Sequence, residues 1–211
     1  MAIRKKTVCG LWMGLACGPV LAGGMAGMQG MQMGPMPSHL PPQGQPLTWK
    51  AVAPLIRDSQ TLGVATDGTA GAGTVTFAGR KANIVMIAVQ PGFPDQTFEI
   101  HGRVDPEIVV HAGAAIRLTL VNMDYGPGMI HGVVIAKLSP PFPEMVSVPP
   151  GARLVELPLE MPRTSKSLKR SGYHVERATF MAPMTPGTYA YFCQMPGHAH
   201  GGMAGRFVVV R

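Results

Sequence analysis

Short apolar runs alternate with turn residues from Gly63 to the C-terminus. Each run is only a few residues long, rich in Val, Ile and Thr, and bounded by Gly, Pro or Asp, which is the pattern of strands. Because no amphipathic helical pattern separates the runs, we predict an all-β domain, an antiparallel sandwich or a Greek-key barrel. The predicted strands are Thr74–Ala78, Asn83–Val89, Thr97–His101, Glu107–His111, Ala115–Asn122, His131–Ala136, Arg153–Leu159, Val175–Ala182, Gly187–Cys193 and Arg206–Val210.

One short helix is predicted ahead of the strands, over Thr48–Gln60. Thr48 is placed to cap this helix, and Pro54 is expected to limit its length. The proline-rich run 139–143 and the segment 158–172 are predicted to be long loops. The chain holds 27 Gly and 21 Pro among 211 residues without a Gly-X-Y period, a composition that excludes collagen and suits many turns.

The N-terminus has the order of an export signal. Three basic residues, Arg4, Lys5 and Lys6, precede a mostly apolar run, and small residues allow cleavage after Ala22. Lipidation at Cys17 and retention of the leader as a single membrane anchor are the two alternatives. The expected location is therefore the periplasm, with possible membrane association through the N-terminus.

Three regions follow from these patterns. Residues 1–22 form the signal peptide or anchor, residues 23–47 a linker rich in Gly, Met and Pro, and residues 48–211 the folded domain. Thioethers are soft ligands for Cu(I), so a metal-collecting role for the linker methionines competes with that of a plain tether.

The charge of the chain excludes some partners. The full sequence carries a net charge of +7, and without the three basic leader residues 15 basic and 11 acidic residues remain, a net charge of +4. This excess is too small to predict nucleic-acid binding. The densest basic stretch, 163–177, is interpreted as a solvated loop, with docking of an acidic redox partner or anionic headgroups as the alternative. Few carboxylates also suggest tolerance of acid.

The segment from Tyr189 to Met203 carries the candidate chemistry. It places Cys193, the single cysteine after the leader, five residues before His198 and ten before Met203. A thiolate, an imidazole and a thioether at a strand end and in the loop behind it can converge on one ion, as in a His₂Cys copper site with a weak axial Met. His131, which opens a predicted strand, is the expected second imidazole.

Other residues compete for these roles. His101 and His111 are alternatives to His131, but both fall at turns and are expected to be ordinary surface histidines. Met195 is the alternative axial ligand, although its position two residues after the cysteine favours packing at the rim. His200 is expected at the rim as well, with a fifth-ligand role as the alternative.

These motifs resemble those of the type 1 copper cupredoxins, and within them most closely those of the rusticyanins. The likeness covers roughly residues 48–211 and rests on Y-F-C-Q-M-P-G-H, G-M-A-G-R-F-V-V, H-G-V-V-I, T-V-T-F-A-G-R-K and T-W-K. It implies a cupredoxin-like Greek-key fold with an N-terminal extension that contains the short helix. It also implies one copper ion held by His131, Cys193, His198 and Met203. Gly132 departs from the pattern, since a hydroxyl residue is usual there.

The expected function is one-electron transfer rather than enzymatic catalysis. The resemblance implies a periplasmic carrier that passes electrons to a c-type cytochrome or cytochrome c oxidase. A multicopper oxidase needs several His-x-His pairs and a binuclear copper site needs two loop cysteines, and the sequence supplies neither. The alternative function is copper handling by the Met-rich linker.

Overall fold

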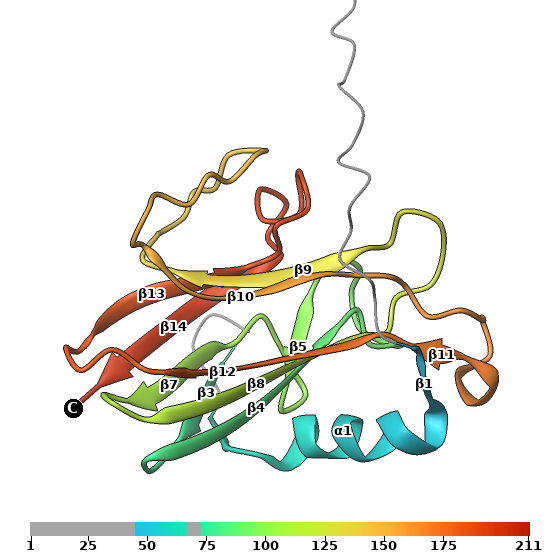
Figure 1. Cartoon of the computed structure of the whole chain (residues 1–211), viewed down its shortest axis with the longest axis horizontal. Coiled ribbons are helices and arrows are strands. Elements are labelled where there is room, and N and C mark those ends of the chain that lie inside the picture. Colours follow the sequence, from blue (N-terminus) through green and yellow to red (C-terminus); the bar gives the residue numbers. More distant parts are fainter. Residues whose placement is uncertain (1–44, 67–72) are drawn as a thin grey trace, which may run out of the picture. The chain divides into compact units, whose positions relative to one another are not determined.

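The computed structural model describes residues 45–66 and 73–211, and their strands form two large sheets (Figure 1). The seven-stranded sheet has the order β10 (Arg153–Glu160), β9 (His131–Ala136), β13 (Gly187–Phe192), β14 (Ala204–Val210), β7 (Glu107–His111), β3 (Thr74–Phe77) and β2 (Val64–Thr66). The five-stranded sheet has the order β12 (Val175–Met181), β8 (Ala115–Asn122), β4 (Lys81–Ala88), β5 (Phe98–Ile100) and β6 (Arg103–Val104).

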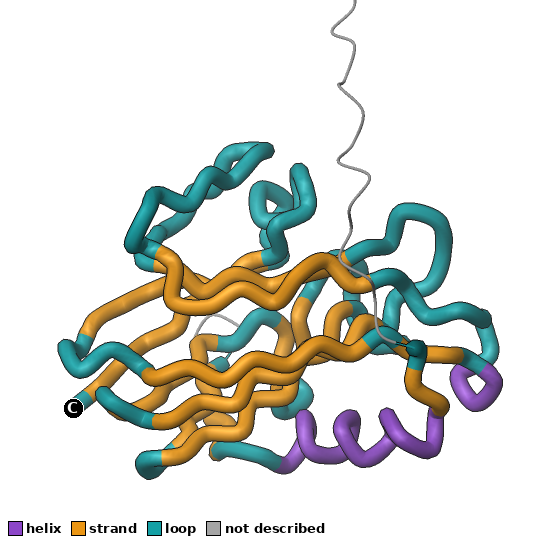
Figure 2. Tube along the Cα trace, in the orientation of Figure 1, coloured by secondary structure: helices purple, strands orange, loops and turns teal. Residues whose placement is uncertain are grey.

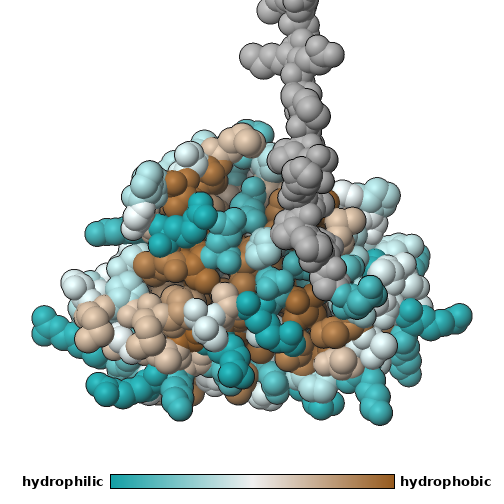
Figure 3. All heavy atoms as spheres, viewed as in Figure 1, coloured by the Kyte–Doolittle hydropathy of each residue, from teal (hydrophilic) through white to brown (hydrophobic). Residues whose placement is uncertain are grey.

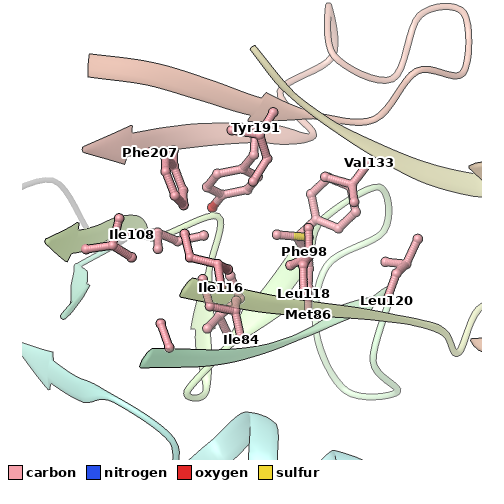
Figure 4. Close-up of a cluster of buried hydrophobic side chains, with 14 of the residues drawn as sticks. Ile84, Met86, Phe98, Ile108, Ile116, Leu118, Leu120, Val133, Tyr191 and Phe207 are labelled. Carbon is pink, nitrogen blue, oxygen red and sulfur yellow. The ribbon is translucent and has the colours of Figure 1, made fainter. Parts of the chain in front are cut away.

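The main core lies between these two sheets. Alternate residues of β4 and β8 point inward and meet side chains from β7, β13 and β14 of the other sheet (Figure 4). Tyr191 stands at its centre, with its ring packed edge-on to Phe98 at 5.9 Å between centroids. Figure 3 shows hydrophilic side chains projecting around the periphery of one face of the molecule. The all-β prediction is confirmed.

The predicted antiparallel arrangement is only partly correct, because three strand pairs are parallel. β3 and β14 each pair in parallel with β7, and β4 pairs in parallel with β8. The reason is topological. β3 and β4 are consecutive strands in opposite sheets, as are β7 and β8, so each sheet receives its next strand by a crossover rather than a hairpin.

The predicted strand positions agree closely with the observed ones. β7, β8 and β9 begin and end at the predicted residues, while β10 runs on to Glu160 and β14 begins at Ala204. The loop predicted over 158–172 also contains a short 3₁₀ helix, η1 (Leu168–Arg170). β5 lies within the predicted strand Thr97–His101. The short strands β1 (Leu47–Thr48), β11 (Gly172–Tyr173), β2 and β6 were not predicted, because so few residues give no periodic signal. β1 and β11 pair with each other close to the helix (Figure 2).

The predicted helix is present as α1 (Trp49–Thr61), which packs against the outer face of the five-stranded sheet. Thr48 occupies the cap position, but its side chain makes no capping hydrogen bond. Pro54 does not limit the helix, contrary to the prediction, since α1 continues for seven residues beyond it. Burial of Val52 against the sheet offsets the backbone hydrogen bond that the proline removes.

Several predictions fall outside the described residues. These are the signal peptide or anchor of residues 1–22 and the Met-rich part of the linker up to residue 44, including Cys17. Within residues 45–66 and 73–211, no helix has the length and apolar character needed to cross a bilayer.

Candidate metal centre

Three predicted ligand side chains meet at one end of the sandwich. His131 is the first residue of β9, Cys193 follows the last residue of β13, and His198 lies in the turn behind it. β9 and β13 are paired neighbours, which brings His131 to the cysteine across 62 residues of sequence. One donor atom from each of the three residues lies within 4.8 Å of the others.

The cysteine sulfur faces the same nitrogen of both rings. The distance from Cys193 Sγ to His131 Nδ1 is 3.9 Å, and that to His198 Nδ1 is 3.5 Å. The two rings lie 5.0 Å apart between centroids. His131 and Cys193 are fully buried and His198 is half-buried, so the centre is closed on the protein side and approaches solvent through His198.

Backbone hydrogen bonds close the loop between β13 and β14 into a tight turn. The Met203 N–H donates to the His198 carbonyl at 2.9 Å, and the Cys193 N–H donates to the Met203 carbonyl at 3.1 Å. These bonds place Met203 beside Cys193, and both side chains are fully buried in the main core. Met195 is only partly buried, at the edge of the same cluster.

A carboxylate fixes the ring of His131. His131 Nε2 donates to Asp124 Oδ2 at 2.8 Å, which leaves the Nδ1 lone pair directed toward the centre. Asp124 is itself held, because its Oδ1 accepts from the Tyr125 N–H and its own N–H donates to the Asn122 side chain. Asp124 was not predicted as part of the site, although an acid seven residues before a ligand histidine was a visible signal.

Electrostatics in the pocket favour a thiolate. Burial raises the pKa of the Cys193 thiol, but hydrogen bonds from His131, His198 and the Met195 and Gly132 N–H groups outweigh it and lower the pKa to about 6. Burial lowers the pKa of His131, but Asp124 and Cys193 together raise it to about 9. The site therefore stabilises the ligand form of the cysteine and a positive charge beside it, which fits a metal cation.

Residues 139–146 clamp the ligand loop from outside. The Gly197 N–H donates to the Glu144 carbonyl at 2.8 Å, and His200 Nδ1 donates to the Phe142 carbonyl at 2.9 Å. His200 does not belong to the donor group, so its role is to tie the two loops together at the rim. Ala199, between Gly197 and His200, is buried against Phe142 and its neighbours.

The remaining predicted histidines lie away from the centre. His111 ends β7 and its Nδ1 donates to the Arg211 carbonyl at 2.7 Å, whereas His101 sits in the turn between β5 and β6. Neither belongs to the donor group at the centre. His174 lies in the basic stretch 163–177, which was predicted to be a solvated loop, but it is half-buried and burial lowers its pKa. The basic stretch also differs from a simple solvated loop, because Arg163 donates to the Met123 carbonyl at 2.8 Å and buttresses the segment that carries Asp124.

The structure explains why residue 132 is a glycine, which the sequence alone did not. A Cβ at this position would lie 2.8 Å from Gln194 Nε2 and 3.0 Å from the Leu157 carbonyl oxygen. The close approach of β10 and of the ligand loop therefore leaves no room for the hydroxyl side chain that the sequence resemblance led us to expect here. The Gly132 N–H contributes a hydrogen bond to Cys193.

The fold and the donor set define a class of protein. A buried thiolate, two imidazoles and an adjacent methionine at one end of a β-sandwich are the components of a type 1 copper cupredoxin.

Comparisons with known proteins give the particular family. Residues 72–211 match the sulfocyanin (SoxE) domain family, and this chain belongs to that family. It is 36% identical to a rusticyanin of Acidithiobacillus ferrooxidans over 145 residues, which cover 67% of this chain and 84% of the relative. Identity to a rusticyanin of Acidithiobacillus ferridurans is 34%, over 67% of this chain and 70% of the relative.

Solved structures agree with the sequence comparisons. A structure of rusticyanin from Thiobacillus ferrooxidans superposes with a TM-score of 0.62 at 30% identity, covering 77% of this chain and 94% of the other. A reduced form of rusticyanin gives a TM-score of 0.60, with 74% and 95% coverage. The family and the donor set together identify copper as the cofactor, and proteins of this kind are electron-transfer proteins.

Proposed function

We propose that this chain is a periplasmic one-electron carrier whose copper ion is held by His131, Cys193, His198 and Met203. The observation that carries the proposal is the convergence of three donor atoms within 4.8 Å, with Met203 buried beside them. Bound copper supplies a one-electron couple, because thiolate, imidazole and thioether ligands suit both of its oxidation states.

The chain's contribution is to hold these ligands still. Asp124 fixes the His131 ring, the turn hydrogen bonds fix His198 and Met203, and the sandwich core fixes Cys193. A rigid ligand set changes little between oxidation states, which lowers the barrier to electron transfer. The Asp124 carboxylate is committed to a ligand histidine, which supports a carrier rather than an enzyme.

The half-buried edge of His198 is the proposed route for electrons. Around it, Pro127 and Pro196 are exposed, and Met129 and Met195 are partly exposed, which gives an apolar rim for brief docking. The proposed partners are a c-type cytochrome and cytochrome c oxidase, as in the rusticyanin-like respiratory role. Export and the possible N-terminal tether are part of the same proposal and rest on the leader sequence.

The first experiment is an optical and EPR spectrum of the copper-loaded protein. We expect an intense thiolate-to-copper band in the visible, lost in Cys193→Ala and retained in the control His200→Ala, whose ring bonds the Phe142 carbonyl instead. A colourless protein that binds only Cu(I), with Cys193→Ala unaffected, would contradict the carrier and favour copper handling by the Met-rich linker.

A second experiment tests the docking rim. Met195→Glu places a charge beside His198 and is expected to slow electron transfer to cytochrome c by about tenfold, as a charge disrupts a small apolar contact. The matched control is Met184→Glu, because Met184 is a highly exposed methionine in the turn before β13. Stopped-flow rates of electron transfer that fall equally in both variants would show that this rim is not the docking surface.

A further inference from the structure

The outer face of the five-stranded sheet is covered by α1 along only part of its length. The helix packs over the part that carries Val85, Ile87 and Val121, which are buried beneath it. The strand ends nearer Lys81 and Met181 continue past the helix and stay exposed (Figure 1). This uncovered part of the face contains none of the copper ligands or the residues that support them.

Strand register places three cations on this face in a diagonal row. Lys81 is level with Ala115 and Met181, Arg117 is level with Asn83 and Thr179, and Arg177 is level with Thr119 and Val85. Side chains at these positions share the face that α1 covers further along. Each step of the diagonal is roughly 8 Å, so the three cations extend over roughly 15 Å.

No acid balances this row in the part of the chain that the structure describes. The ion pairs there join Asp124 to His131, Glu156 to Arg153 and Glu107 to Arg206. Lys81, Arg117 and Arg177 are therefore exposed cations without a carboxylate partner. A row of cations without acidic partners attracts a segment that carries a row of negative charges.

A hollow with apolar walls adjoins the cations. It has a volume of about 880 Å³, is open to solvent, and has Lys81 and Arg117 in its lining with no acidic residue. Its apolar wall comes from both sheets and from the link after α1, and its larger side chains include Leu62, Val64, Phe77, Phe180 and Met181. Val64 and Met181 are each 62% exposed, unusual for residues of that type.

We propose that this cationic groove, formed by Lys81, Arg117 and Arg177 with the apolar wall, binds an extended acidic segment of a partner protein. Acids at every second residue of an extended chain lie about 6.8 Å apart, close to the spacing of the cations. One hydrophobic side chain of the same segment fills the hollow. A single headgroup cannot reach all three cations, and a flat bilayer does not enter a hollow, so a peptide segment fits better than a membrane.

The groove lies at the end of the sheet away from the copper site. Arg117 precedes Asn122 by five residues on β8, roughly 17 Å of strand, and the Asn122 side chain bonds the Met129 carbonyl of the rim loop. A partner held at the groove therefore leaves the His198 edge free. Such attachment keeps the carrier near its partner while the copper end still exchanges electrons, and it does not depend on the copper function.

The test uses a synthetic peptide that alternates glutamate with serine around one central phenylalanine. Binding is followed by NMR on the reduced, copper-loaded full chain, with a glutamine-for-glutamate peptide as the control ligand. We expect shifts at Lys81, Arg117 and Thr179 on the groove, and none in the ligand loop 193–203. Shifts confined to the basic loop 163–170, or no binding, would overturn the proposal.

Charge-matched variants separate the groove from general attraction. Lys81→Gln with Arg117→Gln is expected to weaken peptide binding by about tenfold, the sum of two exposed charge pairs. Lys166→Gln with Lys169→Gln removes the same charge from an exposed loop and is expected to leave affinity unchanged. Equal weakening in both double variants overturns the proposal. Binding to phosphatidylglycerol vesicles through the groove, without peptide binding, would reassign the surface to a membrane and also overturn it.

Discussion

Asp124 is the residue that most directly connects the irregular loop before β9 to the metal centre. Its side chain is nearly buried and divides its two oxygens between the His131 ring and the Tyr125 N–H. Arg163 supports the same segment by donating to the Met123 carbonyl, and it lies 5.0 Å from the centroid of the Tyr125 ring. A negative charge held this firmly behind a ligand stabilises the more positive, oxidised state of the centre.

Replacing Asp124 by Asn tests that charge while keeping an oxygen that can accept the His131 proton. We expect the reduction potential to rise by on the order of 100 mV, because one nearby charge at an effective dielectric constant of about 20 contributes a few kcal/mol. Protein-film voltammetry measures the change, and Asp95→Asn, at an exposed carboxylate in the loop before β5, serves as the control. An unchanged potential with an intact charge-transfer band would show that the centre does not sense the Asp124 charge.

At the scale of elements, the pairing of β13 with β14 fixes the position of the loop that joins them and carries ligand residues. Tyr191 and Gly205 are level in this pair, and the tyrosine ring lies over the glycine. Its hydroxyl donates to the Pro106 carbonyl at 2.6 Å, just before β7. β13, which ends just before Cys193, is thereby fixed to its neighbour β14 and, beyond it, to the segment that leads into β7.

Gly205→Ala is expected to break this arrangement. The new Cβ would overlap the Tyr191 ring and hydroxyl, so the ring must leave its place and lose its bond to Pro106. Overpacking and the lost buried hydrogen bond together are expected to lower the free energy of unfolding by about 3 kcal/mol, measured by urea denaturation. Gly187→Ala on β13 is the control, since its Cβ would meet Tyr189 at an ordinary 3.6 Å. Equal stability of the two variants would contradict this account.

The same elements show what the sequence could and could not predict. β8 and β9 were predicted to the residue because Gly, Pro and Asp turns bound clear runs of branched side chains. Cys193, His198 and Met203 were identifiable because one short loop holds them together. The need for glycine at position 132 could not be predicted from the sequence. It arises because β10 and the Gln194 side chain pack close to the Gly132 backbone, a contact that only the folded sheet reveals. Parallel pairing was missed because local patterns do not say which sheet receives the next strand.

For the whole molecule, acid tolerance has a firmer basis than the small number of carboxylates. Burial raises the pKa of Glu99 to about 7, against hydrogen bonds from Thr97 and the Gln90 N–H that lower it. Burial likewise raises the pKa of Asp105 and of Glu160 to about 7, with nearby Glu99 and Glu176, respectively, adding to the effect. All three groups are therefore neutral in acid, the form that a buried site accepts without cost.

The sign of the pH dependence follows from these raised values. Between the unfolded pKa values of 4.5 for Glu and 3.8 for Asp and the folded values near 7, the folded state binds more protons than the unfolded state. Stability from these groups is therefore complete below about pH 4 and is lost as the pH rises toward 7 and above. This dependence is opposite to that of a protein held together by ionised carboxylates.

Thermal unfolding of the copper-loaded protein from pH 4 to 7.5 checks this expectation against two variants. Wild type is expected to lose stability as the pH rises, and Glu99→Gln with Glu160→Gln is expected to flatten the curve by at least about 2 kcal/mol over that range, since one pKa unit corresponds to about 1.4 kcal/mol. Titration of the ligands is common to both proteins and cancels in the difference. Asp58→Asn, at an exposed carboxylate of α1, is expected to follow wild type. If the double variant kept the wild-type slope, buried carboxyl protonation would not be what stabilises this fold in acid.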